Sequence, residues 1–351
     1  MKKTRIWIFT GFVVICAAFG LIYVFASAAR NAPQATHLVI ESAAATRQTS
    51  NLREIVSQPH ILTLNRVVAG NYGRVQFHPL AGPDKAQPST GMLCERIYFA
   101  ATRGVCLIRT PSNPFVAIVS ATIFGPDLQA LFSLPGEGIP SRVRVSPDGR
   151  YAAFTTFVGG DSYLDSQFST RTMIIDIDSQ QYLGNLESFQ VFRDGQAFRS
   201  VDFNFWGVTF ADDSNLFYAT LRTKGENWLV QGDVRQKRMQ LMHKEVECPS
   251  LSPDGTRIAF KKLQSNKTWR LYVLDLATMA ETPLAETRNI DDQVEWLDNQ
   301  HVIYEWSQAG SGKMDVREAN ADGSGVSTVF LADAGSPAVI RAVSLKKGNA
   351  P

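Results

Sequence analysis

Residues 249–276 combine a tight-turn sequence with two short apolar runs, and this pattern constrains the fold more than any other part of the chain. Ser252-Pro-Asp-Gly255 is typical of a turn, because proline presets φ, aspartate bonds to its own backbone and glycine accepts a left-handed conformation. The runs at 258–260 and 271–276 are predicted strands. Neither run alternates cleanly between apolar and polar residues, so both faces of the predicted sheet are expected to be covered.

Weaker copies of this unit recur along the chain. Residues 145–154 repeat it almost letter for letter, 210–218 and 296–304 are degenerate copies, and 95–99 is the weakest. The second strands of these units are predicted to end at Phe99, Phe154, Tyr218, Phe260 and Tyr304. The gaps between these residues are 55, 64, 42 and 44. A four-stranded propeller blade takes about 40–50 residues, so the shorter gaps fit one blade each and the longer gaps require a blade plus an insertion.

The sequence at 252–260 and 271–276, Ser-Pro-Asp-Gly-x-x-Ile-Ala-Phe followed by Leu-Tyr-Val-Leu-Asp-Leu, resembles the repeat of TolB-like β-propellers. Residues 320–325 also resemble the turn before an outer strand of that family. The resemblance is strong over residues 140–335 and weak over 60–140. It implies an all-β fold, a β-propeller of six four-stranded blades. Too few residues precede this propeller to build the separate domain that TolB carries there, so no partner contact of TolB is transferred to this chain.

Residues 1–30 have the pattern of a targeting segment. Lys2, Lys3 and Arg5 precede an uncharged apolar run of 24 residues, 6–29, which would span about 36 Å as a helix. That length exceeds a bilayer core of about 30 Å and favours a retained transmembrane anchor, whereas the small residues at 26–28 would permit cleavage as a signal peptide. Either outcome places the body at the extracytoplasmic face of the cell membrane, periplasmic or at the cell surface, anchored or secreted.

The rest of the chain is predicted to consist of a linker over 31–58, the propeller over 59–340 and a flexible tail over 341–351. Without residues 1–30 the chain keeps 31 basic and 33 acidic residues, so its charge is close to neutral. A near-neutral body without a basic stripe argues against nucleic-acid binding.

Three cysteines, Cys94, Cys106 and Cys248, lie in the predicted exported part. An oxidising compartment permits disulfides, and the pair closest in sequence is Cys94 with Cys106. A two-residue hairpin turn at Arg103-Gly104 would instead place Cys106 opposite Ala101 and away from Cys94. Pairing with Cys248 and three free thiols therefore remain open alternatives.

The clearest insertion, residues 159–169, is predicted to project from one face of the propeller between the second and third strands of its blade. A loop of this length on a rigid scaffold is a candidate contact surface, and the alternative is a solvated loop of no special purpose. The contact residues would be Gly159, Gly160, Asp161, Ser162 and Tyr163. The aromatic residues at 203–206 are expected in the core between blades rather than on a ligand platform.

No catalytic constellation, cofactor motif or metal motif is recognisable in the sequence. The five histidines lack zinc-protease spacing, no Cys-x-x-Cys occurs, and no Gly-x-Ser-x-Gly elbow is present. Gly310-Ser-Gly-Lys313 lacks the first glycine and the Ser/Thr of a phosphate loop and is predicted to be a hairpin turn. The acidic residues Asp212, Asp213, Asp291, Asp292 and Asp315 could hold Ca²⁺ only if they converged, and turn capping is the simpler interpretation.

The sequence therefore predicts a monomeric, non-catalytic scaffold that binds an unidentified protein or cell-envelope component, attached to the membrane through residues 1–30 and without a cofactor. The alternative is a propeller enzyme acting on glycans through carboxylates at the central funnel. Convergence of Asp and Glu residues from different blades at one mouth of the axis would favour the enzyme.

Overall fold

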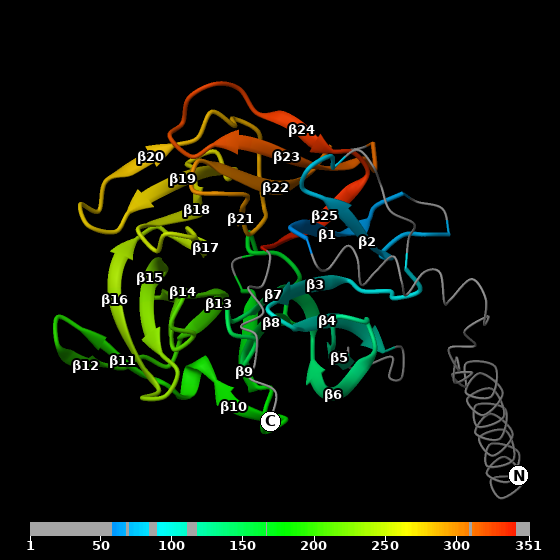
Figure 1. Ribbon diagram of the computed structural model, residues 1–351. Coiled ribbons are helices and arrows are strands. Elements are labelled where there is room, and N and C mark those ends of the chain that lie inside the picture. The colour runs from blue at the N-terminus through cyan, green and yellow to red at the C-terminus, as the bar shows by residue number, and fades with distance from the viewer. Residues whose placement is uncertain are drawn as a thin grey trace, which may run out of the picture. The chain divides into compact units, whose positions relative to one another are not determined.

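The computed structural model describes residues 58–67, 70–83, 90–110, 118–165, 167–308 and 311–341. Within these ranges the chain is all-β, and its only helical element is the short 3-10 turn η1 (Leu186–Ser188). Six sheets are arranged around one axis as the blades of a β-propeller (Figure 1). The fold predicted from the repeat is confirmed. The predicted targeting segment 1–30, nearly all of the linker and the tail from 342 onward lie outside the described residues.

Four of the six blades are simple antiparallel meanders in chain order. Blades 2 and 3 consist of β3 (Arg96–Ala100), β4 (Arg103–Thr110), β5 (Ile118–Phe124) and β6 (Ala130–Glu137), then β7 (Ile139–Val145), β8 (Tyr151–Gly159), β9 (Ser169–Asp176) and β10 (Gln181–Asn185). Blades 5 and 6 consist of β17 (Glu247–Leu251), β18 (Arg257–Leu263), β19 (Trp269–Asp275) and β20 (Glu281–Pro283), then β21 (Glu295–Trp296), β22 (His301–Ser307), β23 (Met314–Asn320) and β24 (Thr328–Leu331).

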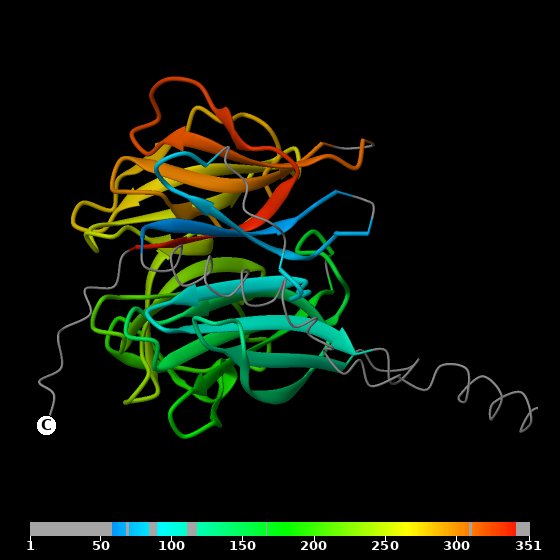
Figure 2. The same cartoon turned by 45° about the vertical axis from the view of Figure 1, so that its right-hand side comes forward.

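Blade 1 closes the ring with strands from both ends of the described chain. Its first strand is β25 (Ala334–Ile340), which pairs with β1 (His60–Asn65), and β1 pairs with β2 (Val75–Pro79). Figure 2 shows the blue β1 beside the red β25. Residues 90–94 supply the fourth, outer strand through the bridge between Arg74 and Leu93. Closure leaves no blade without two neighbours, so each sheet is covered on both faces.

Blade 4 carries an extension that the sequence analysis did not predict. Its own strands are β13 (Asn204–Phe210), β14 (Leu216–Thr223), β15 (Glu226–Asp233) and β16 (Arg238–Lys244), and the hairpin β11 (Gln190–Arg193) and β12 (Gln196–Phe198) adds two more. β11 pairs with β16 in parallel. The predicted insertion at 159–169 is therefore only one of two that lengthen the gap between Phe154 and Tyr218.

The first strand of every blade lies nearest the axis, because β25, β3, β7, β13, β17 and β21 contact one another in turn around the ring. The interpretation of residues 95–99 as a second strand was wrong, since Phe99 lies in β3, the innermost strand of blade 2. The turn predicted at Arg103-Gly104 was also wrong. Ala100 pairs with Arg103, so the turn residues are Ala101, with φ of 51°, and Thr102.

The two Ser-Pro-Asp-Gly turns have the same hydrogen bonds. In the turn after β17, Ser252 Oγ donates to Asp254 Oδ1 at 2.6 Å, and Asp254 Oδ1 accepts the Thr256 backbone N–H at 3.0 Å. Gly255 has φ of +71°, which a side chain would strain. In the turn after β7, Ser146, Asp148 and Gly149 repeat this arrangement. The turns fix the start of each second strand and thereby the register of the blade.

The apolar faces of neighbouring blades pack against each other, as ring closure requires. The largest cluster joins blades 3 and 4 and includes Ile174, Phe205, Phe217 and Val230. Trp206 is fully buried next to this cluster, in the same strand as Phe205. The core position predicted for the aromatic residues at 203–206 is therefore correct for Phe205 and Trp206.

Candidate functional site

The axis of the propeller gathers charged side chains of both signs. Most of the acids belong to blade 6 or to the segment that leads into it, namely Asp291, Asp292, Glu295 and Glu305, and blade 5 adds Glu247 beside Lys261. The bases come from blades 1, 2, 3 and 5: Arg66, Arg96, Arg142, Arg144 and Lys261. The ring brings Arg66 and Arg142 to partners that lie 239 and 149 residues away, whereas Lys261 and Asp291 belong to consecutive blades.

One group of this axial cluster surrounds Asp291. Its carboxylate pairs with Arg142 at 3.2 Å and with the amino group of Lys261, which is completely buried. Burial alone would raise the pKa of Asp291, but the charges of Lys261 and Arg142 hold it below its usual range. The carboxylate therefore stays ionised and is already shared between two cations of the same chain.

Tyr163 covers this group from the predicted contact loop. Its ring lies 4.3 Å from Lys261 Nζ and 5.3 Å from the Arg142 guanidinium carbon, and its hydroxyl is 2.6 Å from Ser141 Oγ. Burial raises the pKa of Tyr163, so the hydroxyl remains protonated. The same ring packs 5.2 Å from Trp206, measured between centroids. Tyr163 therefore connects the loop to the charged centre of the ring.

The structure separates the residues predicted for the contact loop. Gly159 ends β8, Gly160 and Asp161 are exposed, and Ser162 is half-buried. Tyr163 is only 4% exposed and belongs to an apolar cluster that also contains Phe168. Only the outer rim of the loop is therefore available to a partner, because the aromatic side chains of the loop are packed in the core.

A second group of the axial cluster links blades 2, 3 and 6. Arg144 pairs with Glu295 at 3.3 Å and stacks over Tyr98 at 4.6 Å, and the Tyr98 hydroxyl donates to Glu295 Oε1 at 3.1 Å. A third group joins blade 1 to blade 6, because Arg66 pairs with Glu305 at 3.2 Å. Glu305 also accepts the Ser336 backbone N–H at 2.9 Å. These pairs are mostly buried, so they hold specific neighbours together.

A small cavity of about 20 Å³ lies within this cluster. The residues that line it come from three first strands, β3, β7 and β25, and from the segment before β21, and they are Arg96, Ile97, Ser141, Arg142, Val143, Arg144, Asp292, Gln293, Ser336 and Pro337. Burial and the nearby Glu305 raise the pKa of Asp292. The volume admits roughly one water-sized group and no sugar ring.

The enzyme alternative required carboxylates from different blades around a sugar-sized cleft. Four of these axial carboxylates come from blade 6 or the segment before it and one, Glu247, comes from blade 5. Asp291, Glu295 and Glu305 are paired with cations of other blades, and the cavity beside them is small. Of the acidic residues considered for Ca²⁺, Asp213 accepts backbone N–H groups of its own turn and Asp315 accepts the Asp333 N–H. No group of three potential metal ligands occurs in the described part of the chain.

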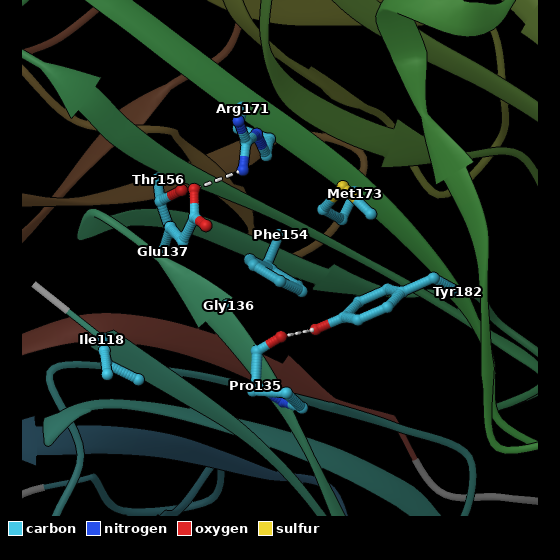
Figure 3. A pocket seen from close by; sticks show the side chains of 9 residues that line it. All are labelled: Ile118, Pro135, Gly136, Glu137, Phe154, Thr156, Arg171, Met173 and Tyr182. Atoms are coloured by element: carbon cyan, nitrogen blue, oxygen red, sulfur yellow. Dashed lines mark hydrogen bonds and ion pairs between the residues drawn. The ribbon is translucent and has the colours of Figure 1, made fainter. Parts of the chain in front are cut away.

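A larger groove of about 520 Å³ lies on the flank of the ring between blades 2 and 3 (Figure 3). Phe154, Met173, Ile118 and Pro135 form its apolar lining. At one end Arg171 pairs with Glu137 at 2.6 Å, and at the other the Tyr182 hydroxyl donates to the Pro135 carbonyl at 2.7 Å. Pro135 lies in the outer strand β6, where its missing N–H leaves no ladder bond unmade.

Cys94 and Cys106 form a disulfide, with Cα atoms 5.5 Å apart. The pair closest in sequence is therefore the correct one, and the objection to it came from the wrong turn position. Cys106 lies opposite Ile97, and Cys94 sits just before that strand. The bond ties the outer strand of blade 1 to blade 2. Cys248 is free and fully buried, and burial raises the pKa of its thiol.

Exposed apolar side chains gather on one face of the ring. The connections between second and third strands all lie on this face, here called the loop face, because every blade has the same strand order. Five large apolar residues that are at least 41% exposed lie in or beside these connections: Val67, Tyr72, Val158, Leu164 and Leu263. Five other large apolar residues are exposed outside these connections: Leu93, Leu131, Val201, Val326 and Val329. The second-to-third-strand connections therefore carry half of the large exposed apolar side chains in the described ranges.

No helix in the described ranges is both long enough and apolar enough to cross a membrane. Comparison with family models finds no match, and no curated protein is similar in sequence. Among solved structures, TolB from Acinetobacter baumannii is similar, with a TM-score of 0.56 and 15% identity over 81% of this chain and 67% of the TolB chain. A chain of the nidogen/laminin complex has a TM-score of 0.49 and 10% identity, over 81% of this chain and 99% of its own.

An oligogalacturonate lyase in complex with manganese has a TM-score of 0.46 and 11% identity, over 71% of this chain and 72% of the lyase. At these identities the likeness concerns the fold alone. The structural neighbours of this chain are TolB-like and other β-propeller proteins, and the property it shares with them is the propeller fold.

Proposed function

We propose that this chain is an extracytoplasmic β-propeller scaffold whose loop face binds a protein of the cell envelope, without a catalytic role. The observation that carries the proposal is the set of five exposed apolar side chains in or beside the second-to-third-strand connections, from blades 1, 3 and 5. The outer rim of the 159–169 loop contributes Leu164, which is 45% exposed. A rigid ring presenting apolar loop tips fits recognition of a partner surface better than turnover of a substrate.

The axial cluster also supports this proposal, because its geometry argues against catalysis. Asp291, Glu295 and Glu305 are each engaged by a cation of the same chain, Asp292 accepts a backbone N–H, and Glu247 accepts the indole N–H of Trp269. The cavity between them has no room for a sugar ring. The Cys94–Cys106 disulfide and the targeting pattern of residues 1–30 both favour an oxidising location outside the cytoplasm.

Site-specific photo-crosslinking in intact cells tests the proposal. The crosslinking amino acid replaces Leu164, Tyr72 or Leu263 on the loop face, and the matched control position is Val326, which is 79% exposed in the connection between β23 and β24 on the opposite face. We expect one adduct of the same mass from the three loop-face positions and none from Val326. Equal adducts from both faces, or none from the loop face, would contradict the proposal.

A further inference from the structure

The sheet that closes the ring begins at a buried histidine. His60 is the first residue of β1, where it pairs with Ile340 of β25 on one side and with Pro79 of β2 on the other. Its side chain is 0% exposed, and its ring lies 5.5 Å from the Phe77 ring, measured between centroids. Phe77 belongs to the apolar cluster shared by blades 1 and 2, so His60 faces blade 2 at the point where the two ends of the ring are joined.

The His60 ring is hydrogen-bonded through one of its two nitrogens. Its Nδ1 lies 2.7 Å from the Gln58 carbonyl oxygen, which can only accept, so Nδ1 carries the proton of the neutral ring. Nε2 is buried and has no hydrogen-bond partner among the described residues. A second proton would therefore place a charge on a nitrogen that no described group solvates, and a buried charge without a partner is costly.

The titratable groups packed around this sheet do not compensate such a charge. β3, the strand of blade 2 that packs against β1 and β25, carries Arg96 and Tyr98, and both are hydrogen-bonded at the axis. The other face of the sheet carries His78, which is adjacent to Phe77 in β2. That face packs on blade 6, whose charged residues in the strands next to β25 are Glu295, His301, Glu305, Asp315, Arg317 and Glu318. None of the ion pairs or hydrogen bonds in the described ranges joins these groups to His60.

We propose that the closing sheet is an acid-sensitive latch, in which protonation of His60 separates β1 from β25 while the other blades stay folded. In each of blades 2–6 the first and second strands form a hairpin, so only blade 1 joins strands from the two ends of the described chain. Separation uncovers Leu62 and Leu64, which are fully buried between blades 1 and 2. The latch concerns the state of the ring, and its test needs no partner of the proposed function.

The direction of the pH dependence follows from the burial of the ring. Burial lowers the pKa of His60 from its ordinary value of 6.5, and the hydrogen bond to Gln58 opposes this shift only in part. The closed sheet therefore binds fewer protons than a form in which β1 has separated and His60 is in water. By linkage, separation becomes more favourable as pH falls through 6.5 and levels off below the lower pKa of the closed sheet.

Hydrogen exchange of the whole protein at about pH 7.5 and about pH 5, followed by mass spectrometry, tests the latch. Rates are corrected for the intrinsic pH dependence of amide exchange, and β18 and β19 of blade 5 serve as the internal reference. We expect the opening of β1 and β25 to increase about tenfold relative to the reference at the lower pH, because one unit of lowered pKa corresponds to a tenfold change in the equilibrium constant. The same pH dependence in all blades would overturn the proposal.

A variant that cannot be protonated completes the test. His60→Asn retains a side-chain N–H for the Gln58 carbonyl, and the pH-dependent opening of β1 and β25 should disappear. It should persist in the matched control His243→Asn, which alters a partly exposed histidine paired with Glu281 between blades 4 and 5. Opening that still follows pH in His60→Asn would contradict the latch. An NMR titration of the unaltered protein needs no variant to fold, and a midpoint of the His60 ring at or above 6.5 would also overturn the proposal.

Discussion

Substitution of Asp291 is the most direct test of how much the axial ion pairs contribute to the free energy of unfolding. It neutralises Lys261, which is 0% exposed, and Arg142, whose side chain is 7% exposed. Removing one partner of a buried ion pair costs about 3–5 kcal/mol, because the other charge remains buried without compensation. The Asp291 side chain is itself 36% exposed, so water screens part of this loss. We therefore expect Asp291→Asn to lower the free energy of unfolding by about 2–3 kcal/mol.

Urea unfolding followed by tryptophan fluorescence measures this change, since Trp269 lies 4.0 Å from the Lys261 amino group. The matched control is Glu226→Gln, which breaks the Lys244–Glu226 pair, a 2.6 Å contact with both side chains about half exposed. An exposed pair is screened by water and contributes little to stability, so the control should shift the midpoint little. An unchanged m value would show that the variant changes stability without changing the surface exposed on unfolding.

A compensating variant distinguishes an unpaired charge from a simple change of shape. Replacing Lys261 by Met in the Asp291→Asn background removes the buried cation and leaves an apolar side chain against Tyr163 and Trp269. The double variant should regain at least half of the lost stability. If Asp291→Asn costs no more than Glu226→Gln, or if Lys261→Met makes it worse, the axial pair is not what stabilises this region.

Three further outcomes follow from named contacts. Gly232→Ala should lower the free energy of unfolding measured in urea by about 1–3 kcal/mol, because its Cβ would lie 2.1 Å from the fully buried Phe217 ring. A variant as stable as the unaltered protein would refute the clash. Replacing Cys94 and Cys106 by Ala should cost about 2–4 kcal/mol, and a reductant should then leave the Tm of the variant unchanged. Because the pKa of Asp291 is depressed in the folded state, its contribution to the free energy of unfolding is complete above its ordinary pKa of 3.8 and is lost as pH falls through its lower folded pKa. Acid unfolding of Asp291→Asn should therefore lack this part of the loss of stability.

The blades that were predictable from sequence are those whose turns demand particular residues. Ser-Pro-Asp-Gly specifies a turn at 146–149 and at 252–255, and the strand that follows each turn was located correctly. Blade 2 lacks such a turn, and its two-residue hairpin uses Ala101 in a left-handed conformation, for which the sequence offers no usual signal. Phe99 was consequently assigned to the wrong strand, although the existence of a β-hairpin there was evident.

The sequence contains a signal from which the hairpin that extends blade 4 could have been predicted. Asp194-Gly195 is a strong two-residue hairpin sequence, and both residues have positive φ in the structure, 51° and 77°. Its partner could not have been predicted, because β11 pairs in parallel with β16, nearly fifty residues later. Local turn chemistry identifies a hairpin, whereas the sheet that it joins depends on packing between distant segments.

The axial cluster was missed because its members are single charged residues spread over blades. One signal was present in the innermost strand β7, where Arg142 and Arg144 alternate with the buried Val143 and Val145. Arginines at alternate positions of a strand that is buried throughout must face something other than solvent. In a propeller, the side of the first strand that faces the axis is the place where such residues can meet counter-charges.

Most of the axial ion pairs join different blades, so they can all form only when the ring closes with every blade present. Arg66 at the start of the propeller meets Glu305 near its end, across 239 residues, and Arg142 and Arg144 meet Asp291 and Glu295. In a chain that lacks blade 6, the cations of blades 1 and 3 would lie at the axis without partners. Burying an uncompensated charge is costly, so a ring that closed one blade early would be disfavoured. The pairing of β25 with β1 supplies the hydrogen bonds of closure, and the axial ion pairs are complete only when blade 6 is in place.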